Sequence, residues 1–210
     1  MKTSNSRIVQ TINLSPGHKR YKGADIEYVP RFLRQEETNV LIEALKSEVP
    51  WSQPEVRIFG RFSPSPRLSA WYGDQHAVYQ YSGVINFPLP WLPWLHELRQ
   101  RIERYTQDSF NSVLLNFYRG GSDGMGWHRD NEPELGINPV IASISLGFPR
   151  RFVMRHYKRR DMPRLEVSPE NGSLLIMRGQ TQGLWQHAVP KTRMSVGLRL
   201  NLTFRNVLLT

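Results

Sequence analysis

The second half of the chain alternates between apolar and polar residues with a period of two. From residue 111 onward this alternation runs through the segments SVLLNFYR, VIASISLGF, RFVMRHY, GSLLIMR and MSVGLRLNLTFR, with turn residues between them. Successive side chains of a β-strand point to opposite faces, so the pattern is typical of short antiparallel strands. The sequence therefore predicts a mainly β core.

Two amphipathic segments that precede this region are expected to form helices. Residues 36–48 carry apolar side chains at helical spacing and end before Pro50, and residues 92–105 carry an apolar stripe with arginines on the opposite side. Strands and helices do not alternate regularly, which argues against a parallel α/β sheet. We therefore expect an α+β, mainly β fold with a double-stranded β-helix (jelly roll) core and N-terminal helices packed on one sheet.

The length of 210 residues suits a single domain. Residues 1–24 are polar and basic without periodicity, so we predict a flexible arm there and one domain over residues 25–210. Residues 51–90 are rich in aromatic residues, Pro and Gly, which favours short strands and exposed loops. We expect the protein to be a monomer.

Composition limits the classes of partner and metal site. The net charge of +10 favours a polyanionic partner such as nucleic acid. The absence of cysteine excludes disulfides and thiolate metal sites, so a metal would be bound by His and carboxylate side chains. Because there is no apolar run of about 20 residues and no secretory signal at the start, we expect no membrane contact and a cytoplasmic location, or a nuclear one in a eukaryote.

One short segment, GMGWHRDNEPE over residues 124–134, combines the residue types that bind metals. His128 and Asp130 are two residues apart, so on an extended segment both side chains would point to the same side. The best third ligand is His187, between two strand-like segments. Two histidines and one carboxylate leave coordination positions open and suit an Fe(II) centre that activates oxygen. A chance His-x-Asp pair and a zinc hydrolase are the alternatives.

The last strand-like segment, RLNLTFR, has one apolar face and one cationic face. Two arginines that flank small polar residues suit a dicarboxylate such as 2-oxoglutarate, because each guanidinium can pair with a carboxylate through two hydrogen bonds. An earlier segment places Asn and Tyr on one face, just before the loop that carries His128. An ordinary solvent-exposed strand face is the alternative. The residues on these faces are Asn116, Tyr118, Arg199, Asn201, Thr203 and Arg205.

Taken in order, these motifs resemble those of a known family. Asn116-x-Tyr118, His128-x-Asp130, His187 and the Arg199 to Arg205 pair are similar to the AlkB family of Fe(II)/2-oxoglutarate-dependent dioxygenases. The resemblance covers roughly residue 50 to the end, including GxxGWHRDNEPEL and RLNLTFR. The stretches IFGRFSPSPR, YGD and YQYSG are most similar to members that repair alkylated duplex DNA.

The resemblance implies a cofactor set and a reaction. Fe(II) would be bound by the catalytic residues His128, Asp130 and His187, and O2 and 2-oxoglutarate would be cosubstrates. The 2-oxoglutarate would be held by Asn116, Tyr118, Arg199, Thr203 and Arg205, with Asn201 on the same face. The implied reaction removes N-methyl groups from 1-methyladenine and 3-methylcytosine in DNA, with release of formaldehyde, succinate and CO2.

The resemblance also implies how a damaged base is bound. A methyl group on the pairing edge is inaccessible in a duplex, so the base must be flipped out or single-stranded. Residues 51–90 would form a nucleotide-recognition lid, with Phe59 as a wedge in the base stack. The other implied substrate contacts are phosphates for Arg61 and Arg67, pocket walls for Tyr79 and Tyr81, and the polar edge of the base for Asn131 and Glu132.

Basic residues near a predicted hairpin suggest a further phosphate-binding surface. This basic belt consists of Arg150, Arg151, Arg155, Lys158, Arg159, Arg160 and Arg164. The expected partner is methylated DNA, duplex and single-stranded, and RNA stays open. Two alternatives remain at this point: an oxygenase that acts on RNA or another substrate, and a non-catalytic module that binds damaged DNA.

Overall fold

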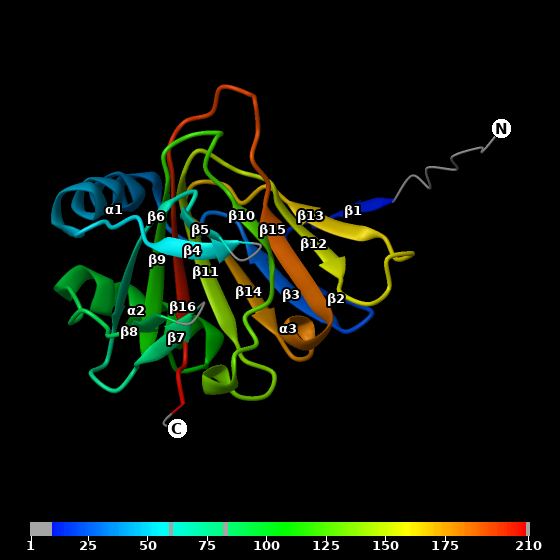
Figure 1. Cartoon of the computed structure of the whole chain (residues 1–210), viewed down its shortest axis with the longest axis horizontal. Coiled ribbons are helices and arrows are strands. Elements are labelled where there is room, and N and C mark those ends of the chain that lie inside the picture. Colours follow the sequence, from blue (N-terminus) through cyan, green and yellow to red (C-terminus); the bar gives the residue numbers. More distant parts are fainter. Residues whose placement is uncertain (1–9, 59–60, 82–83, 209–210) are drawn as a thin grey trace.

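Two β-sheets stacked face to face make up most of the molecule (Figure 1). The computed structural model describes residues 10–58, 61–81 and 84–208, and for residues 56–58, 61–62, 79–81 and 84–86 it describes only the backbone. Side chains from both sheets share one core cluster, in which Ile141 and Met177 of one sheet meet Met154 of the other. The prediction of a mainly β fold is confirmed.

The larger sheet has seven antiparallel strands. Their order is β2 (Gly17–Tyr21), β3 (Ala24–Val29), β14 (Ser173–Arg178), β11 (Ile141–Gly147), β16 (Arg199–Arg205), β9 (Ser112–Tyr118) and β6 (Leu68–Gly73).

The smaller sheet has five strands, of which only the pair formed by β1 and β13 is parallel. Their order is β1 (Thr11–Asn13), β13 (Arg164–Val167), β12 (Phe152–His156), β15 (Trp185–Val189) and β10 (Met125–His128). From β9 onward the chain passes repeatedly from one sheet to the other, so residues far apart in the sequence meet between the sheets.

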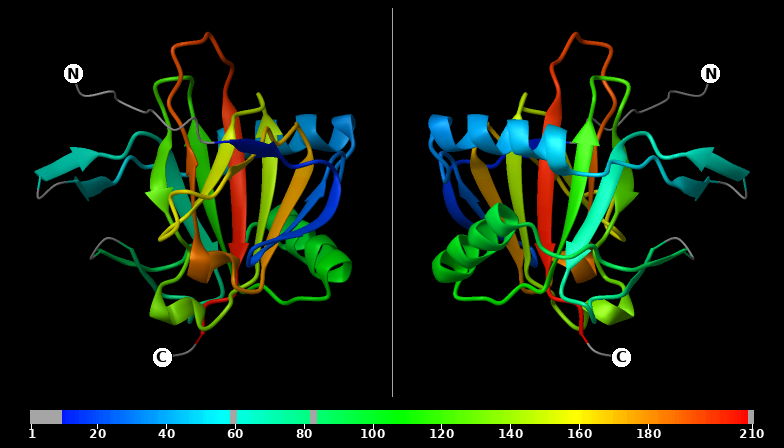
Figure 2. Two further views of the ribbon diagram at one scale, coloured as in Figure 1. Left: turned by 90° about the vertical axis from the view of Figure 1, so that its right-hand side faces the viewer. Right: turned by 90° about the vertical axis from the view of Figure 1, so that its left-hand side faces the viewer.

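Two helices cover the outer face of the larger sheet (Figure 2). They are α1 (Gln35–Glu48) and α2 (Pro93–Thr106), which confirms both predicted helices to within one residue. Leu45 and Ile102 are fully buried in one cluster with Leu202 and Phe204 of β16. The apolar stripes of the helices therefore pack against the apolar face of β16, which leaves its other face to the space between the sheets.

The prediction of a flexible arm over residues 1–24 is wrong for the part that the structure describes. Residues 11–13 and 17–21 form β1 and β2, and β2 pairs with β3 through a two-residue turn in which Lys22 and Gly23 both have positive φ, 47° and 84°. Strands at sheet edges carry charged residues, so β2 lacks an apolar alternation. Residues 1–9 lie outside the described residues.

Residues 51–90 include two separate hairpins, and their role as a nucleotide-recognition lid stays a prediction. One hairpin is β4 (Glu55–Ile58) with β5 (Arg61–Pro64), and the other is β7 (Tyr79–Tyr81) with β8 (Val84–Asn86). Between them in the sequence, β6 belongs to the larger sheet. Both hairpins project from the same side of the molecule (Figure 2).

Two short helical turns complete the fold, η1 (Pro133–Leu135) after β10 and α3 (Thr181–Leu184) before β15. Among the described residues, no helix is both long and apolar enough to cross a membrane.

Candidate metal and cosubstrate site

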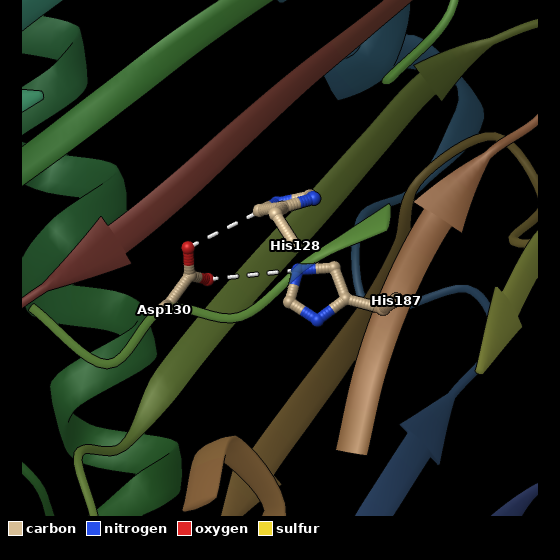
Figure 3. A group of neighbouring side chains, drawn as sticks. All are labelled: His128, Asp130 and His187. Atoms are coloured by element: carbon tan, nitrogen blue, oxygen red, sulfur yellow. Dashed lines mark ion pairs between the residues drawn. The ribbon is translucent and has the colours of Figure 1, made fainter. Parts of the chain in front are cut away.

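Two neighbouring strands and the loop between the sheets bring three metal-binding side chains together. His128 on β10 lies opposite His187 on the adjacent β15, and the centroids of their rings are 4.2 Å apart. The carboxylate of Asp130 points toward both rings, 4.0 Å from Nε2 of His128 and 3.8 Å from Nε2 of His187 (Figure 3). One ligand atom from each residue lies within 4.8 Å of the others, so the three could bind one ion.

One hydrogen bond and one ring contact orient the two histidines of the cluster. Nδ1 of His128 donates to the carbonyl oxygen of Gly126 over 2.9 Å, because a carbonyl can only accept. The lone pair of His128 is therefore on Nε2, the atom nearest Asp130. The ring of His187 is stacked on Phe152 at 5.2 Å between centroids.

The charge state of the three side chains also suits a cation. Burial lowers the pKa of His128, and burial lowers the pKa of His187 to about 3, so both rings are neutral at physiological pH. Burial alone would raise the pKa of Asp130, but the nearby Arg205 cation outweighs burial and lowers it. Two neutral imidazoles and one carboxylate form the ligand set typical of non-heme Fe(II).

A buried arginine faces the same cavity as the cluster. Arg199 is only 2% exposed, and its Nη2 donates to Oγ of Ser145 over 2.9 Å. Its Nε and Nη1 have no partner in hydrogen-bonding geometry among the described residues. Burial lowers the pKa of this guanidinium, although the neighbouring Tyr118 opposes the shift. A buried cation with free donors is costly unless it is paired, so Arg199 suits a bound carboxylate.

The other predicted cosubstrate residues line the same cavity. They are Asn116, Tyr118, Asn201, Thr203 and Arg205. Nη2 of Arg205 donates to Oδ1 of Asp130 over 3.0 Å. The Asn201 amide donates to Oγ of Ser143 and to the carbonyl of Ile144, and its Oδ1 accepts from Oγ1 of Thr203. The polar groups of Asn201 and Thr203 are thus used inside the sheet, so a direct contact of either with a cosubstrate stays a prediction.

Arg67 lies inside this cavity, which contradicts the expectation that it contacts phosphates on the surface. It is 6% exposed, and its Nε donates to Oδ1 of Asn116 over 2.6 Å. The reason is its position directly before β6, which pairs with β9 so that Ser69 lies opposite Asn116. Arg67 fixes the orientation of the Asn116 amide, because only its oxygen can accept from a guanidinium. The sequence pattern around Arg67 gives no indication of this role.

Comparisons with known proteins agree with this geometry. Residues 25–205 match the 2OG-Fe(II) oxygenase superfamily. The DNA oxidative demethylase ALKBH2 of cattle is 36% identical over 213 residues, which covers 96% of this chain and 76% of the relative. The mouse alpha-ketoglutarate-dependent dioxygenase alkB homolog 3 is 44% identical over 186 residues, which covers 85% of this chain.

This chain belongs to the AlkB family of 2OG-Fe(II) oxygenases. The resemblance found in the sequence is confirmed. The enzymes of this superfamily use Fe(II), 2-oxoglutarate and O2, and the cluster and Arg199 fit an iron ion and a carboxylate, respectively. The chain spans 64% of the length of mouse alkB homolog 3. A solved structure, OsALKBH1, shares the fold with a TM-score of 0.65 at 19% identity, over 92% of this chain and 99% of that one.

For several residues that were predicted to contact the substrate of this AlkB-family chain, the structure does not describe the side chain. Phe59 lies outside the described residues, and for Arg61 on β5 and for Tyr79 and Tyr81 on β7 the structure describes only the backbone. Directly after Asp130, the loop carries two further predicted residues, Asn131, which is exposed, and Glu132, which is half-buried.

Most of the basic belt is on the surface of the AlkB-family fold. Cζ of Arg155 lies 4.2 Å from the ring centroid of Trp127, and that of Arg164 lies 5.8 Å from it. Lys158, Arg159 and Arg160 are exposed, and Arg151 pairs with Glu166.

Arg150 does not belong to the surface belt, contrary to the prediction. It is 3% exposed and donates to the backbone carbonyls of Gly120, Asp123 and Pro190 over 2.8 to 2.9 Å. These carbonyls lie in loops outside the named strands, and a guanidinium has enough donors for all three. Arg150 therefore ties the loop after β9 to the loop after β15.

Proposed function

We propose that this chain is an Fe(II)/2-oxoglutarate-dependent dioxygenase that removes N-methyl groups from alkylated DNA bases. The observation that carries the proposal is the buried cluster of His128, Asp130 and His187 in one cavity with the unpaired donors of Arg199. The relatives named DNA oxidative demethylase support DNA as the substrate. Typical lesions would be 1-methyladenine and 3-methylcytosine.

Each residue of the cavity has a defined task in this proposal. The iron would be held by His128, Asp130 and His187. When bound, it would supply the oxidising chemistry together with 2-oxoglutarate and O2. Arg199 pairs with one carboxylate of 2-oxoglutarate, and Arg205 holds the Asp130 carboxylate in its ionised form. Asn116, oriented by Arg67, and Tyr118 add polar contacts from β9. The burial of these groups excludes water, which strengthens every charge interaction among them.

The overall reaction accounts for all atoms. One oxygen atom of O2 enters succinate as 2-oxoglutarate loses CO2, and the other is inserted into a C–H bond of the N-methyl group. The N-hydroxymethyl group then breaks its C–N bond, releasing formaldehyde and leaving the unmodified base. The DNA strand is not cut.

Residues 51–90 serve as the nucleotide-recognition region in this proposal. The hairpins β4–β5 and β7–β8 project from the same side of the molecule (Figure 2). They carry Arg61, Tyr79 and Tyr81, and Phe59 lies outside the described residues. Aromatic side chains on such hairpins could stack on an extruded base and fill the gap it leaves. Asn131 and Glu132 would meet the polar edge of the base.

The eight strands from β9 to β16 support the assignment of a jelly roll. β9, β16, β11 and β14 are consecutive neighbours in the larger sheet, and β10, β15, β12 and β13 are consecutive neighbours in the smaller one. The first and last of these eight strands, β9 and β16, are hydrogen-bonded neighbours, and so are the second and the seventh, β10 and β15. This nested pairing is expected for a double-stranded β-helix. A monomeric state and a cytoplasmic or nuclear location stay predictions from the sequence.

The decisive experiment is demethylation of a defined oligonucleotide. The protein is loaded anaerobically with Fe(II) and then given O2, 2-oxoglutarate and a duplex that carries one 1-methyladenine, and the mass of the DNA and the succinate formed are measured together. Loss of one methylene unit with an equal amount of succinate is the expected result. Parallel single-stranded DNA and RNA substrates determine the preferred strand type. Succinate without any change in the DNA would keep the oxygenase and exclude this substrate.

Damaged-DNA binding without turnover is the outcome that would support the non-catalytic alternative. The control is Asp130→Ala, which removes one ligand of the cluster. If the wild-type protein binds methylated DNA but forms no more succinate than Asp130→Ala, the enzymatic proposal is wrong.

A further inference from the structure

We infer that Gln182 is a positioning residue for the metal-binding carboxylate of Asp130 and thereby sets the affinity of the cluster for iron. The inference rests on the proposed role of the cluster as an iron site. It comes from a hydrogen bond between segments 52 residues apart: Oε1 of Gln182 accepts from the backbone N–H of Asp130 over 3.0 Å. Gln182 is fully buried, although glutamine is usually a surface residue.

Asp130 needs this contact because the sheet does not hold it. β10 ends at His128, so Asp130 lies beyond the last pair of the ladder with β15. The carboxylate of Asp130 is held by Arg205, and its backbone is held by Gln182. Together the two contacts fix both ends of the residue, which is how groups around a metal site orient its direct ligands.

The orientation of the Gln182 amide is itself determined. Its Nε2 lies 3.4 Å from Sδ of Met177, a weak acceptor that has no hydrogen to donate. A flipped amide would place two N–H donors against the N–H of Asp130, which is unfavourable. The carbonyl oxygen therefore faces Asp130.

The turn that carries Gln182 is anchored on its other side. Oγ1 of Thr181 accepts from the backbone N–H of Asp25 on β3 over 2.8 Å, and Nε1 of Trp185 donates to the carbonyl of Lys22 over 3.2 Å. A second contact joins the turn to the metal segment, because Nη1 of Arg129 donates to the carbonyl of Gly183 over 2.9 Å. The chain then continues into β15, so one segment both supplies His187 and holds Asp130.

The test compares Gln182→Met with Met177→Leu. Gln182→Met keeps the length of the side chain and removes the acceptor for Asp130, whereas Met177→Leu removes only the sulfur contact and leaves that acceptor in place. Two quantities are measured: the dissociation constant for Fe(II) under anaerobic conditions, and the hydrogen-exchange rate of the Asp130 amide in the metal-free protein. Thermal melting confirms that each variant is folded.

We expect Gln182→Met to weaken Fe(II) binding about 10- to 100-fold, the usual effect of losing a group that orients a metal ligand. The Asp130 amide should exchange faster than in the wild type. The Michaelis constant for 2-oxoglutarate at saturating iron should stay within about threefold of the wild-type value, which is less than the tenfold change that corresponds to about 1.4 kcal/mol. Met177→Leu should leave both the iron affinity and the exchange rate near wild-type values. If Gln182→Met does not fold, Gln182→Asn, whose amide is one methylene too short to reach, replaces it.

Unchanged iron affinity and unchanged amide exchange in a folded Gln182 variant would overturn the inference. An equal loss in Met177→Leu would also overturn it, because the effect would then come from general loosening of the core. A wild-type protein that binds Fe(II) but demethylates no oligonucleotide would instead contradict the proposed function and leave the role of Gln182 intact.

Discussion

Arg205 donates from Nη2 to Oδ1 of Asp130 over 3.0 Å, and both side chains are at least 95% buried. Asp130 belongs to the metal cluster, whereas Arg205 lies on β16 together with Arg199, which has free donors for a carboxylate. The ion pair therefore connects the two halves of the site. It also explains why the cluster carries an ionised carboxylate in a buried environment.

Replacement of Asp130 by Ala should abolish iron binding and turnover. It should also lower the free energy of unfolding of the metal-free protein by roughly 3 kcal/mol, because the buried Arg205 cation loses this carboxylate. Urea unfolding and anaerobic iron titration measure the two effects. Asp161→Ala is the control, since its ion pair with Arg159 is exposed and should contribute less than about 1 kcal/mol. Full activity of Asp130→Ala in an iron-replete assay would rule out the metal cluster.

Arg199→Met should separate cosubstrate binding from folding. Charge-assisted hydrogen bonds contribute about 1.5–3 kcal/mol each, so the Michaelis constant for 2-oxoglutarate should rise at least tenfold. The metal-free variant should be at least as stable as wild type, because a buried guanidinium with two free donors is replaced by an apolar side chain. Steady-state kinetics and thermal melting give both quantities. An unchanged Michaelis constant would remove Arg199 from the cosubstrate site.

Two neighbouring arginines should differ sharply in their effect on stability. Arg150→Met removes three hydrogen bonds from a buried guanidinium to backbone carbonyls and should lower the free energy of unfolding by roughly 3 kcal/mol. Arg151→Met removes an ion pair in which the arginine side chain is 63% exposed, and it should cost less than about 1 kcal/mol. Denaturant unfolding of both variants at one pH is the measurement. Equal losses would contradict the role of Arg150 as a tie between loops.

The stability of the protein should depend on the ionisation of Asp123. Burial alone would raise the pKa of this carboxyl, but hydrogen bonds from the side chain and backbone of Arg119 outweigh burial and lower it. A lowered pKa in the folded state means that the stabilisation is complete above the ordinary carboxyl pKa of about 4 and is lost as the pH falls through the folded-state pKa.

Asp123→Asn therefore should cost roughly 2 kcal/mol at neutral pH. The difference between wild type and variant should shrink as the pH falls below about 4, the ordinary carboxyl value. Unfolding curves collected from pH 7 down to the acid transition measure this. A difference that is constant over the whole range would show that Asp123 does not contribute through its charge.

The exposed part of the basic belt should make binding of DNA sensitive to salt. Replacing Arg159 and Arg160 together by Ala should weaken binding to all sequences alike and reduce the slope of log affinity against log salt by about one for each lost phosphate contact. Lys46→Ala on α1 is the control, because it removes a charge at another place on the surface. Fluorescence anisotropy at several salt concentrations is the measurement, and an unchanged slope would exclude these two residues from the DNA path.

The two-residue alternation of side chains along a strand predicts from the sequence which residues of β16 line the cavity. On β16, the odd-numbered residues from Arg199 to Arg205 line the cavity, and the even-numbered residues Leu200, Leu202 and Phe204 pack under the helices. The same reasoning cannot predict hydrogen-bond partners, because these come from other strands. The side-chain amide of Asn201, for example, donates to Ser143 and Ile144 of β11. The His-x-Asp spacing predicted the metal cluster but gave no indication of the buried Gln182.

Arginines were the least predictable residues, because a guanidinium can be solvated on the surface or enclosed by carbonyls. Arg67 and Arg150 were expected to contact phosphates, and both are buried. Nothing local distinguishes Arg150 from Arg151. The hairpin formed by β2 and β3 could have been found from the Lys22-Gly23 pair, since a two-residue turn with positive φ at both positions favours glycine.

The pairing of β2 with β3 has a practical consequence for anyone who shortens this protein. A chain cut just before Ala24 would lose β2 and leave β3 as the new border of the larger sheet, with a row of free N–H and C=O groups. The carbonyl of Lys22 that accepts from Trp185 would be lost as well. Such a truncated chain should aggregate during refolding and should hold iron less firmly, although every residue of the metal cluster would still be present.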